Sequence, residues 1–175
     1  MAPKRKAAAA AKEEAAPTKK GKGGLAIGDD FPNLPELEFD ESTPEEKKTV
    51  KLSDVLKDHG IILFFYPKAN TGGCTKQACG FQDNLSEIEK AGYKVFGMSA
   101  DKPKSQAGWK AKRGFKYNLL SDPSYEVLKT LGVTKGAKSI SRSHIVVEKG
   151  GKIKDVRIGI SPGDSFAEAL KTVTA

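Results

Sequence analysis

The chain has 175 residues, enough to bury one core and leave a tail, and its formal net charge is +8. No apolar run approaches the length of a membrane span, and no signal-peptide core follows the N-terminus, so we expect neither a membrane protein nor a secreted one. The two cysteines and two histidines do not have the spacing of a zinc site, and we expect no metal and no cofactor.

The positive charge is concentrated near the N-terminus. Residues 1–24 contain seven basic and two acidic side chains, whereas residues 25–175 contain 23 basic and 20 acidic ones. The nearly balanced charge of the longer part argues against a broad nucleic-acid-binding face on it. Because residues 1–24 have almost no large apolar side chain, we predict a disordered basic tail followed by one domain over 25–175.

The basic residues of the tail form two clusters. Lys4–Lys6 is followed by twelve residues and then by the lysines of Lys19–Lys22, a bipartite pattern that resembles a nuclear localisation signal. A solubilising tail and a mitochondrial presequence are the alternatives, and the two glutamates and single arginine count against a presequence. We therefore expect the nucleus as the location, with the cytoplasm as a second one. Weak nucleic-acid contact by the tail stays an open alternative.

The first half of the domain begins with extended segments and a buried strand. Leu37–Phe39 is expected to be extended, Thr49–Leu52 to be a short strand, and Ser53 to cap a brief helix that ends near Gly60. Ile61–Tyr66 is a continuous apolar run, which is typical of a strand covered on both faces. The helix that follows carries Phe81, Leu85 and Ile88 at spacings that predict one buried stripe.

The second half alternates strands and helices and ends with a hairpin and a helix. Strands are expected at Tyr93–Ser99, Asn118–Leu120, His144–Glu148 and Lys152–Ile160. Helices are expected at Pro103–Arg113, from Asp122 to Leu131, and in a last segment with an apolar stripe of Phe166, Leu170 and Val173. The turn Lys149–Gly151 is a hairpin signal. This order predicts an α/β fold, a thioredoxin-like sandwich with a central mixed sheet flanked by helices.

Both cysteines lie on the helix that follows the first long strand. Cys74 falls in its first turn, where unpaired backbone N–H groups and the positive end of the helix dipole favour a thiolate over a thiol. Cys79 follows five residues later, so the two Cα atoms of an intact helix would be roughly 8–9 Å apart. A disulfide requires about 7 Å or less, so the pair could bond only if the helix start unwinds. Without a secretory signal, paired cysteines are more often catalytic than structural.

Four motifs along the chain resemble those of one protein family. Pro67, Thr71 and Cys74 reproduce the pattern Pro-x-x-x-Thr-x-x-Cys, and the segments GMSADKPKSQAGW, LLSDPSYEVLKTLGV and SISRSHIVVEKGGKI follow in the family's order. From about Leu25 to the C-terminus the chain thus resembles the peroxiredoxins of the AhpC/TSA family. It is most similar to the subfamily called peroxiredoxin Q or bacterioferritin comigratory protein, and to the fungal nuclear thiol peroxidases. That subfamily usually has proline where this chain has Gly72.

The resemblance implies a function and a set of site residues. It implies a thiol-dependent peroxidase of antioxidant defence that reduces hydrogen peroxide and alkyl hydroperoxides, with Cys74 peroxidatic and Cys79 resolving. The two would form an intramolecular disulfide that thioredoxin reduces, in a protein expected to be a monomer. Arg142 occupies the family's arginine position, Thr71 would orient the peroxide, and Pro67 would shield the sulfur.

A charge argument independently requires a cation near Cys74. Intrinsic nucleophilicity falls as a thiolate becomes easier to form, so ionisation alone gives only a small gain in rate. Negative charge also develops on the departing oxygen when a peroxide bond breaks, and a positioned guanidinium stabilises that charge. Arg142 is therefore the candidate, although a solvated surface arginine is the commoner fate of this residue type.

Two other functions stay open from the sequence. A protein disulfide oxidoreductase would use the cysteine pair on protein thiols, but it would favour a Cys-x-x-Cys spacing that this chain lacks. A chromatin-associated binding protein would use the basic tail. Cys79 could also be an inert helix cysteine. We expect His59 at a helix end and His144 at a strand edge, assign neither a role, and place Trp109 partly in the core.

Overall fold

The computed structural model describes residues 24–175, so the predicted tail of 1–24 lies, except for Gly24, outside the described residues. Seven strands form one sheet in the order β2-β1-β5-β4-β3-β6-β7. The strands are β1 (Leu37–Phe39), β2 (Thr49–Val50), β3 (Gly60–Phe65), β4 (Tyr93–Ser99), β5 (Asn118–Ser121), β6 (Ser143–Val147) and β7 (Ile153–Ile158). Strand β4 pairs in parallel with β3 and β5, and the other pairs are antiparallel, which confirms the predicted mixed sheet.

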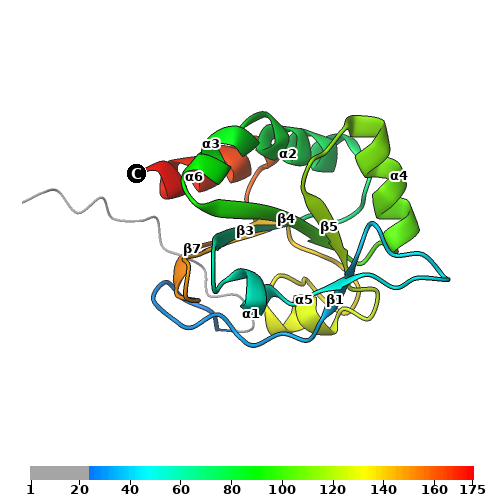
Figure 1. The fold of residues 1–175 in the computed structure, drawn as a ribbon, viewed down its shortest axis with the longest axis horizontal. Coiled ribbons are helices and arrows are strands. Elements are labelled where there is room, and N and C mark those ends of the chain that lie inside the picture. Colours follow the sequence, from blue (N-terminus) through cyan, green and yellow to red (C-terminus); the bar gives the residue numbers. More distant parts are fainter. Residues whose placement is uncertain (1–23) are drawn as a thin grey trace, which may run out of the picture.

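Helices cover both faces of this sheet (Figure 1). They are α1 (Leu52–Val55), α2 (Gly72–Asp83), α3 (Leu85–Lys90), α4 (Pro103–Arg113), α5 (Glu126–Thr130) and α6 (Pro162–Thr174). One face carries α2, α3, α4 and α6, and the opposite face carries α1 and α5 (Figure 1). Within residues 24–175, no helix combines the length and the apolar character needed to cross a bilayer.

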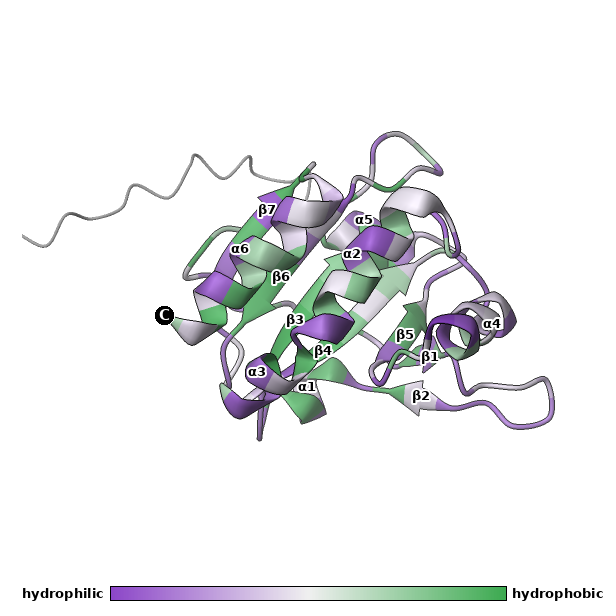
Figure 2. Ribbon diagram, turned by 90° about the horizontal axis from the view of Figure 1, so that it is seen from above, coloured by the Kyte–Doolittle hydropathy of each residue, from purple (hydrophilic) through white to green (hydrophobic). Residues whose placement is uncertain are grey.

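Strand β3 separates two hydrophobic cores. Its residues are all buried, as the continuous apolar run predicts, and successive side chains point to opposite faces. Ile61, Leu63 and Phe65 pack in the core beneath α1 and α5. Ile62 and Phe64 pack with the helices of the other face. Seen from above, the central strands are the most hydrophobic part of the ribbon (Figure 2).

Several predicted boundaries are wrong for local reasons. Helix α1 begins at Leu52 after Lys51, so Ser53 lies inside the helix and does not cap it. The cysteine helix is interrupted at Asn84, whose side-chain amide donates to the Gly80 carbonyl at 2.8 Å and so competes with the helical hydrogen bonds. Helix α5 begins only at Glu126, because Tyr125 before it has a left-handed backbone with φ 62°.

Other predictions about burial are partly wrong. Of the predicted stripe on α6 only Val173 is buried, together with Ser165 and Ala169, while Phe166 and Leu170 are half-buried. His144, expected at a strand edge, is fully buried, because β6 lies between β3 and β7. Trp109 is 2% exposed, which confirms its place in the core.

Helices α2 and α6 pack closely at a glycine. A Cβ atom added to Gly80 of α2 would overlap the ring of Phe166 on α6. The absence of a side chain at Gly80 therefore sets how near α6 lies to the cysteine helix.

We expect Gly80→Ala to destabilise the protein by about 1–3 kcal/mol, because the ring of Phe166 must move, despite the better helix propensity of alanine. Gly108→Ala in α4 is the matched control: nothing lies within 4 Å of the added Cβ, so the free energy of unfolding should rise by up to about 1 kcal/mol. Denaturant unfolding followed by far-UV circular dichroism measures both. Equal effects of the two changes would contradict this packing.

Candidate active site

Cys74 is the third residue of α2 and faces the interior. Thr71 precedes the helix in an extended conformation, and its side chain does not cap the first turn. The first helical hydrogen bond runs from the Thr75 N–H to the Thr71 carbonyl at 2.8 Å, so the N–H groups of residues 72–74 have no helical acceptor. The sulfur of Cys74 thus lies at the positive end of a helix, as the sequence predicts, and the residue is only 1% exposed.

Arg142 provides the cation that the charge argument requires. Its Nη2 atom lies 3.5 Å from the Cys74 Sγ atom, and its Nη1 atom donates to the Gln77 side-chain oxygen at 3.0 Å. The carbonyl of Arg142 accepts hydrogen bonds from the N–H groups of Gly159 and Ile160, both at 2.9 Å. Arg142 is therefore held both by its backbone carbonyl and by its guanidinium group.

The loop from β3 to α2 carries the other two predicted residues. Pro67 and Thr71 are both exposed, and the Thr71 hydroxyl donates to the Lys68 carbonyl at 2.9 Å. A hydroxyl also accepts, so its lone pairs stay available to a ligand. The parts in catalysis expected of these two residues stay predictions.

The same loop is held at two points. Before it, the Tyr66 phenol donates to Gln106 Oε1 at 2.5 Å; burial raises the pKa of Tyr66 well above its usual value, so the phenol keeps its proton. Within it, Asp101 Oδ2 accepts from the Ala69 N–H at 2.8 Å and from the Ser99 hydroxyl at 2.6 Å. These contacts limit how far the loop can move relative to the sheet.

Cys79 is half-buried on the same helix as Cys74, and both cysteines are free. Because α2 is continuous from Gly72 to Asp83, it separates the two sulfurs as the spacing predicts. Bonding between them requires the first turns of α2 to unwind.

Sequence reasoning missed two residues that touch the site. Gln77 binds the Arg142 guanidinium, and Trp109 donates its indole N–H to the Thr75 hydroxyl at 3.3 Å. The sequence contains a signal for Gln77, which lies three residues after Cys74, because residues three apart share one face of a helix. It contains no such signal for Trp109, because only the fold brings α4 next to the start of α2. Among residues 24–175, no group of three or more His, Cys, Asp or Glu side chains could hold a metal ion.

Comparison with known proteins gives a consistent result. Residues 27–156 match the AhpC/TSA family. Peroxiredoxin bcp1 of Schizosaccharomyces pombe is 41% identical over 86% of this chain and 75% of its own, and peroxiredoxin Bcp of Escherichia coli is 38% identical over 64% and 76%. The crystal structure of peroxidoxin BcpB from Mycobacterium tuberculosis superposes with a TM-score of 0.78 at 33% identity, over 86% of this chain and 97% of that one. A cysteine-to-serine mutant of PrxQ from Xylella fastidiosa gives the same TM-score of 0.78 at 26% identity, over 86% and 96%.

A thioredoxin-like sheet, a buried cysteine at a helix N-terminus and these relatives define a thiol-dependent peroxidase. The chain belongs to the AhpC/TSA family of peroxiredoxins, and its relatives are of the Bcp and peroxiredoxin Q type.

The two glycines before Cys74 allow a direct test of the Arg142 contact. A Cβ atom added to Gly73 would lie 3.0 Å from Arg142 Nη2, whereas one added to Gly72 would meet nothing within 4 Å. We expect Gly73→Ala to displace the guanidinium and slow the first oxidation of Cys74 about tenfold, and Gly72→Ala to leave it unchanged. Single-turnover peroxide consumption measures both rates. Equal rates for the two variants would show that the position of Arg142 does not limit the reaction.

Proposed function

We propose that Cys74 attacks hydrogen peroxide and alkyl hydroperoxides with Arg142 as the group that stabilises the transition state. The observation that supports this most is the 3.5 Å contact between Arg142 Nη2 and the Cys74 sulfur. A guanidinium has five N–H donors in a fixed planar fork, so it can face both a thiolate and the peroxide oxygens.

The first step transfers one oxygen atom. The Cys74 thiolate attacks the terminal oxygen of the hydroperoxide, an S–O bond forms and the O–O bond breaks. The departing alkoxide or hydroxide takes a proton from solvent, and Cys74 becomes a sulfenic acid. Arg142 stabilises the departing oxygen as its charge grows, while Thr71 and the Cys74 N–H orient the peroxide and Pro67 shields the sulfur.

The second step forms a disulfide. The Cys79 thiol attacks the sulfenic sulfur of Cys74, an S–S bond forms, and the hydroxyl leaves as water. For this step the first turns of α2 must unwind, which breaks the contacts of Thr75 with Trp109 and of Gln77 with Ser165. Gly72 and Gly73 lower the cost of that unwinding because they adopt non-helical conformations readily.

The last step consumes an external dithiol. One thiolate of a thioredoxin-type partner attacks the disulfide, and its second thiol resolves the mixed disulfide, so that both cysteines return to thiols and the partner leaves oxidised. We propose a monomer for the whole cycle, since both sulfurs lie on one helix of one chain.

Two cysteine variants test the cycle. Cys74→Ser should abolish peroxide consumption, because it removes the sulfur that Arg142 contacts. Cys79→Ser should complete one oxidation at the rate of the unmodified protein and then stall in assays coupled to thioredoxin. Peptide mapping after one equivalent of peroxide should show residues 74 and 79 linked in the unmodified protein. Normal turnover by Cys74→Ser would end the proposal, and normal coupled turnover by Cys79→Ser would remove only the resolving role.

We also propose that the basic tail directs the protein to the nucleus. There the peroxidase would serve antioxidant defence. The proposal depends on the two clusters Lys4–Lys6 and Lys19–Lys22.

Replacing the basic residues of both clusters by alanine should lower the nuclear-to-cytoplasmic ratio of a fluorescent fusion. Lys12→Ala, which removes a charge between the clusters, should not change that ratio. If both variants stay nuclear, the tail is not the import signal. If nuclear import persists and only retention becomes sensitive to salt, the tail serves nucleic-acid contact instead.

A further inference from the structure

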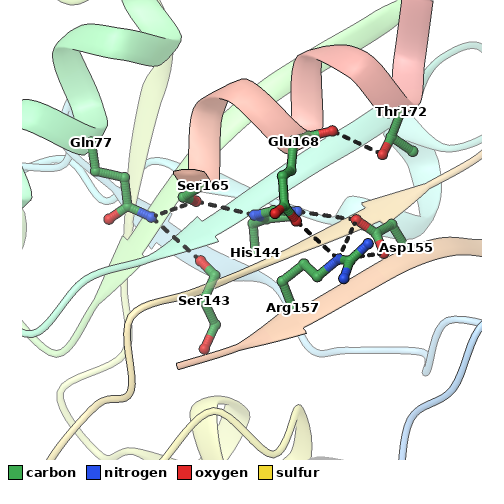
Figure 3. A network of polar contacts seen from close by, with 8 residues as sticks. All are labelled: Gln77, Ser143, His144, Asp155, Arg157, Ser165, Glu168 and Thr172. Carbon is green, nitrogen blue, oxygen red and sulfur yellow. Dashed lines mark hydrogen bonds and ion pairs between the residues drawn. The ribbon is translucent and has the colours of Figure 1, made fainter. Parts of the chain in front are cut away.

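A line of side-chain contacts leads from Arg142 away from Cys74 into the protein. Arg142 Nη1 contacts Gln77 Oε1 at 3.0 Å, and Gln77 Nε2 contacts Ser165 Oγ at 3.0 Å. Ser165 Oγ lies 3.1 Å from His144 Nδ1, and His144 Nε2 lies 3.3 Å from Asp155 Oδ2. Figure 3 shows the part from Gln77 to Asp155. The line joins α2, α6, β6 and β7, and the steps proposed above give no chemical role to His144, Ser165 or Asp155.

The residues of this line are shielded from water. Gln77, His144 and Ser165 are 0% exposed, and Asp155 is 3% exposed. Buried polar groups are costly unless their hydrogen bonds are made, and a network of them is stable only when each member is satisfied. Four such residues in one contiguous line therefore constrain one another strongly.

The two ends of the line determine its direction. Arg142 has donors only, so Gln77 must present its oxygen to the guanidinium. Its nitrogen then donates to Ser165 Oγ at 3.0 Å and to the Ser143 carbonyl at 3.5 Å. Ser165 Oγ accepts from that nitrogen, and its own hydrogen is free to be donated to His144 Nδ1. With that hydrogen donated to Nδ1, His144 can hold its own hydrogen on Nε2 and donate it to the carboxylate, which only accepts. In this arrangement every bond of the line points the same way, from the donor-only guanidinium to the acceptor-only carboxylate.

Asp155 keeps the charge that this direction requires. The carboxylate of Asp155 pairs with Arg157 Nε at 3.2 Å and faces His144 Nε2 at 3.3 Å, so a cation lies beside it. Arg157 also pairs with Glu168 of α6 at 3.2 Å, and Figure 3 shows both beside His144. The charged groups around His144 are thus Asp155 and Arg157 on β7, Glu168 on α6, and Arg142 just before its own strand.

We propose that His144, Ser165 and Asp155 are positioning residues for the peroxidase reaction. Through the one-way line of hydrogen bonds they fix the Gln77 amide with its oxygen toward Arg142, and so hold the guanidinium against the Cys74 sulfur. This inference rests on the proposed role of Arg142. It requires that His144 be neutral with its hydrogen on Nε2. A second hydrogen on Nδ1 would leave the Ser165 hydroxyl hydrogen without an acceptor among its side-chain partners in the described residues.

The protonation of His144 tests the direction without measuring activity. The chain has two histidines, so the ¹⁵N-labelled full chain gives two sets of imidazole signals, and His59→Gln identifies those of His144. We expect the hydrogen of His144 on Nε2 and none on Nδ1. Gln77→Glu replaces the donor nitrogen by an acceptor, which reverses the Ser165 hydroxyl and requires a hydrogen on His144 Nδ1. In that variant we expect a hydrogen on both ring nitrogens of His144. An unmodified protein with Nδ1–H, or no change in His144 in the variant, would overturn the proposal.

Two buried serines test the consequence for the reaction. Ser165→Ala removes the central link, and we expect it to slow single-turnover oxidation of Cys74 by hydrogen peroxide about tenfold. Ser143→Ala is the matched control: Ser143 is also 0% exposed and next to His144, but its hydroxyl donates to the Ser141 carbonyl, outside the line. The backbone carbonyl of residue 143, which accepts from Gln77 Nε2, is kept in this variant. It should lose similar stability and keep its rate. Equal rates for the two variants would refute the positioning role, while loss of activity in Cys74→Ser would still uphold the peroxidase itself.

Discussion

The contact between a guanidinium and a nearly inaccessible sulfur is the constraint on which the rest of the site depends. Two opposite charges about 4 Å apart attract by about 1 kcal/mol in water but by about 4 kcal/mol at an effective dielectric constant of about 20. Arg142 Nη2 lies 3.5 Å from the sulfur of a residue that is 1% exposed, so a thiolate there would be attracted more strongly than one in water. Burial would otherwise oppose the thiolate, and the cation makes a charged sulfur compatible with its surroundings.

The fold brings these two groups together from distant parts of the chain. Cys74 comes from the start of α2, and Arg142 immediately precedes β6, which pairs with β3. They meet because α2 follows the end of β3, and Phe65 at that end pairs with Ser143, the residue after Arg142. The absence of a side chain at Gly73 leaves room for the guanidinium beside the start of α2.

How much the sequence predicts depends on the kind of feature. The strand at Ile61–Tyr66 could be predicted because a continuous apolar run indicates burial on both faces, and β3 is buried throughout. The helix Pro103–Arg113 could be predicted because proline is favoured in the first turn of a helix, and α4 begins at Pro103. The break at Asn84 does not follow from patterning, because one side-chain hydrogen bond decides it. The burial of His144 does not follow either, since it depends on β7 covering β6, a tertiary fact with no local signal.

The single tryptophan of the chain gives the protein an internal optical reporter. The indole of Trp109 is buried, packs against the ring of Tyr66 and donates to Thr75, one residue beyond the reactive cysteine. The unwinding that the proposed disulfide step requires takes the Thr75 acceptor away from the indole, so the emission of Trp109 should differ between the reduced and the disulfide-linked protein. Formation of the disulfide would then be readable in intrinsic fluorescence, without attaching any label.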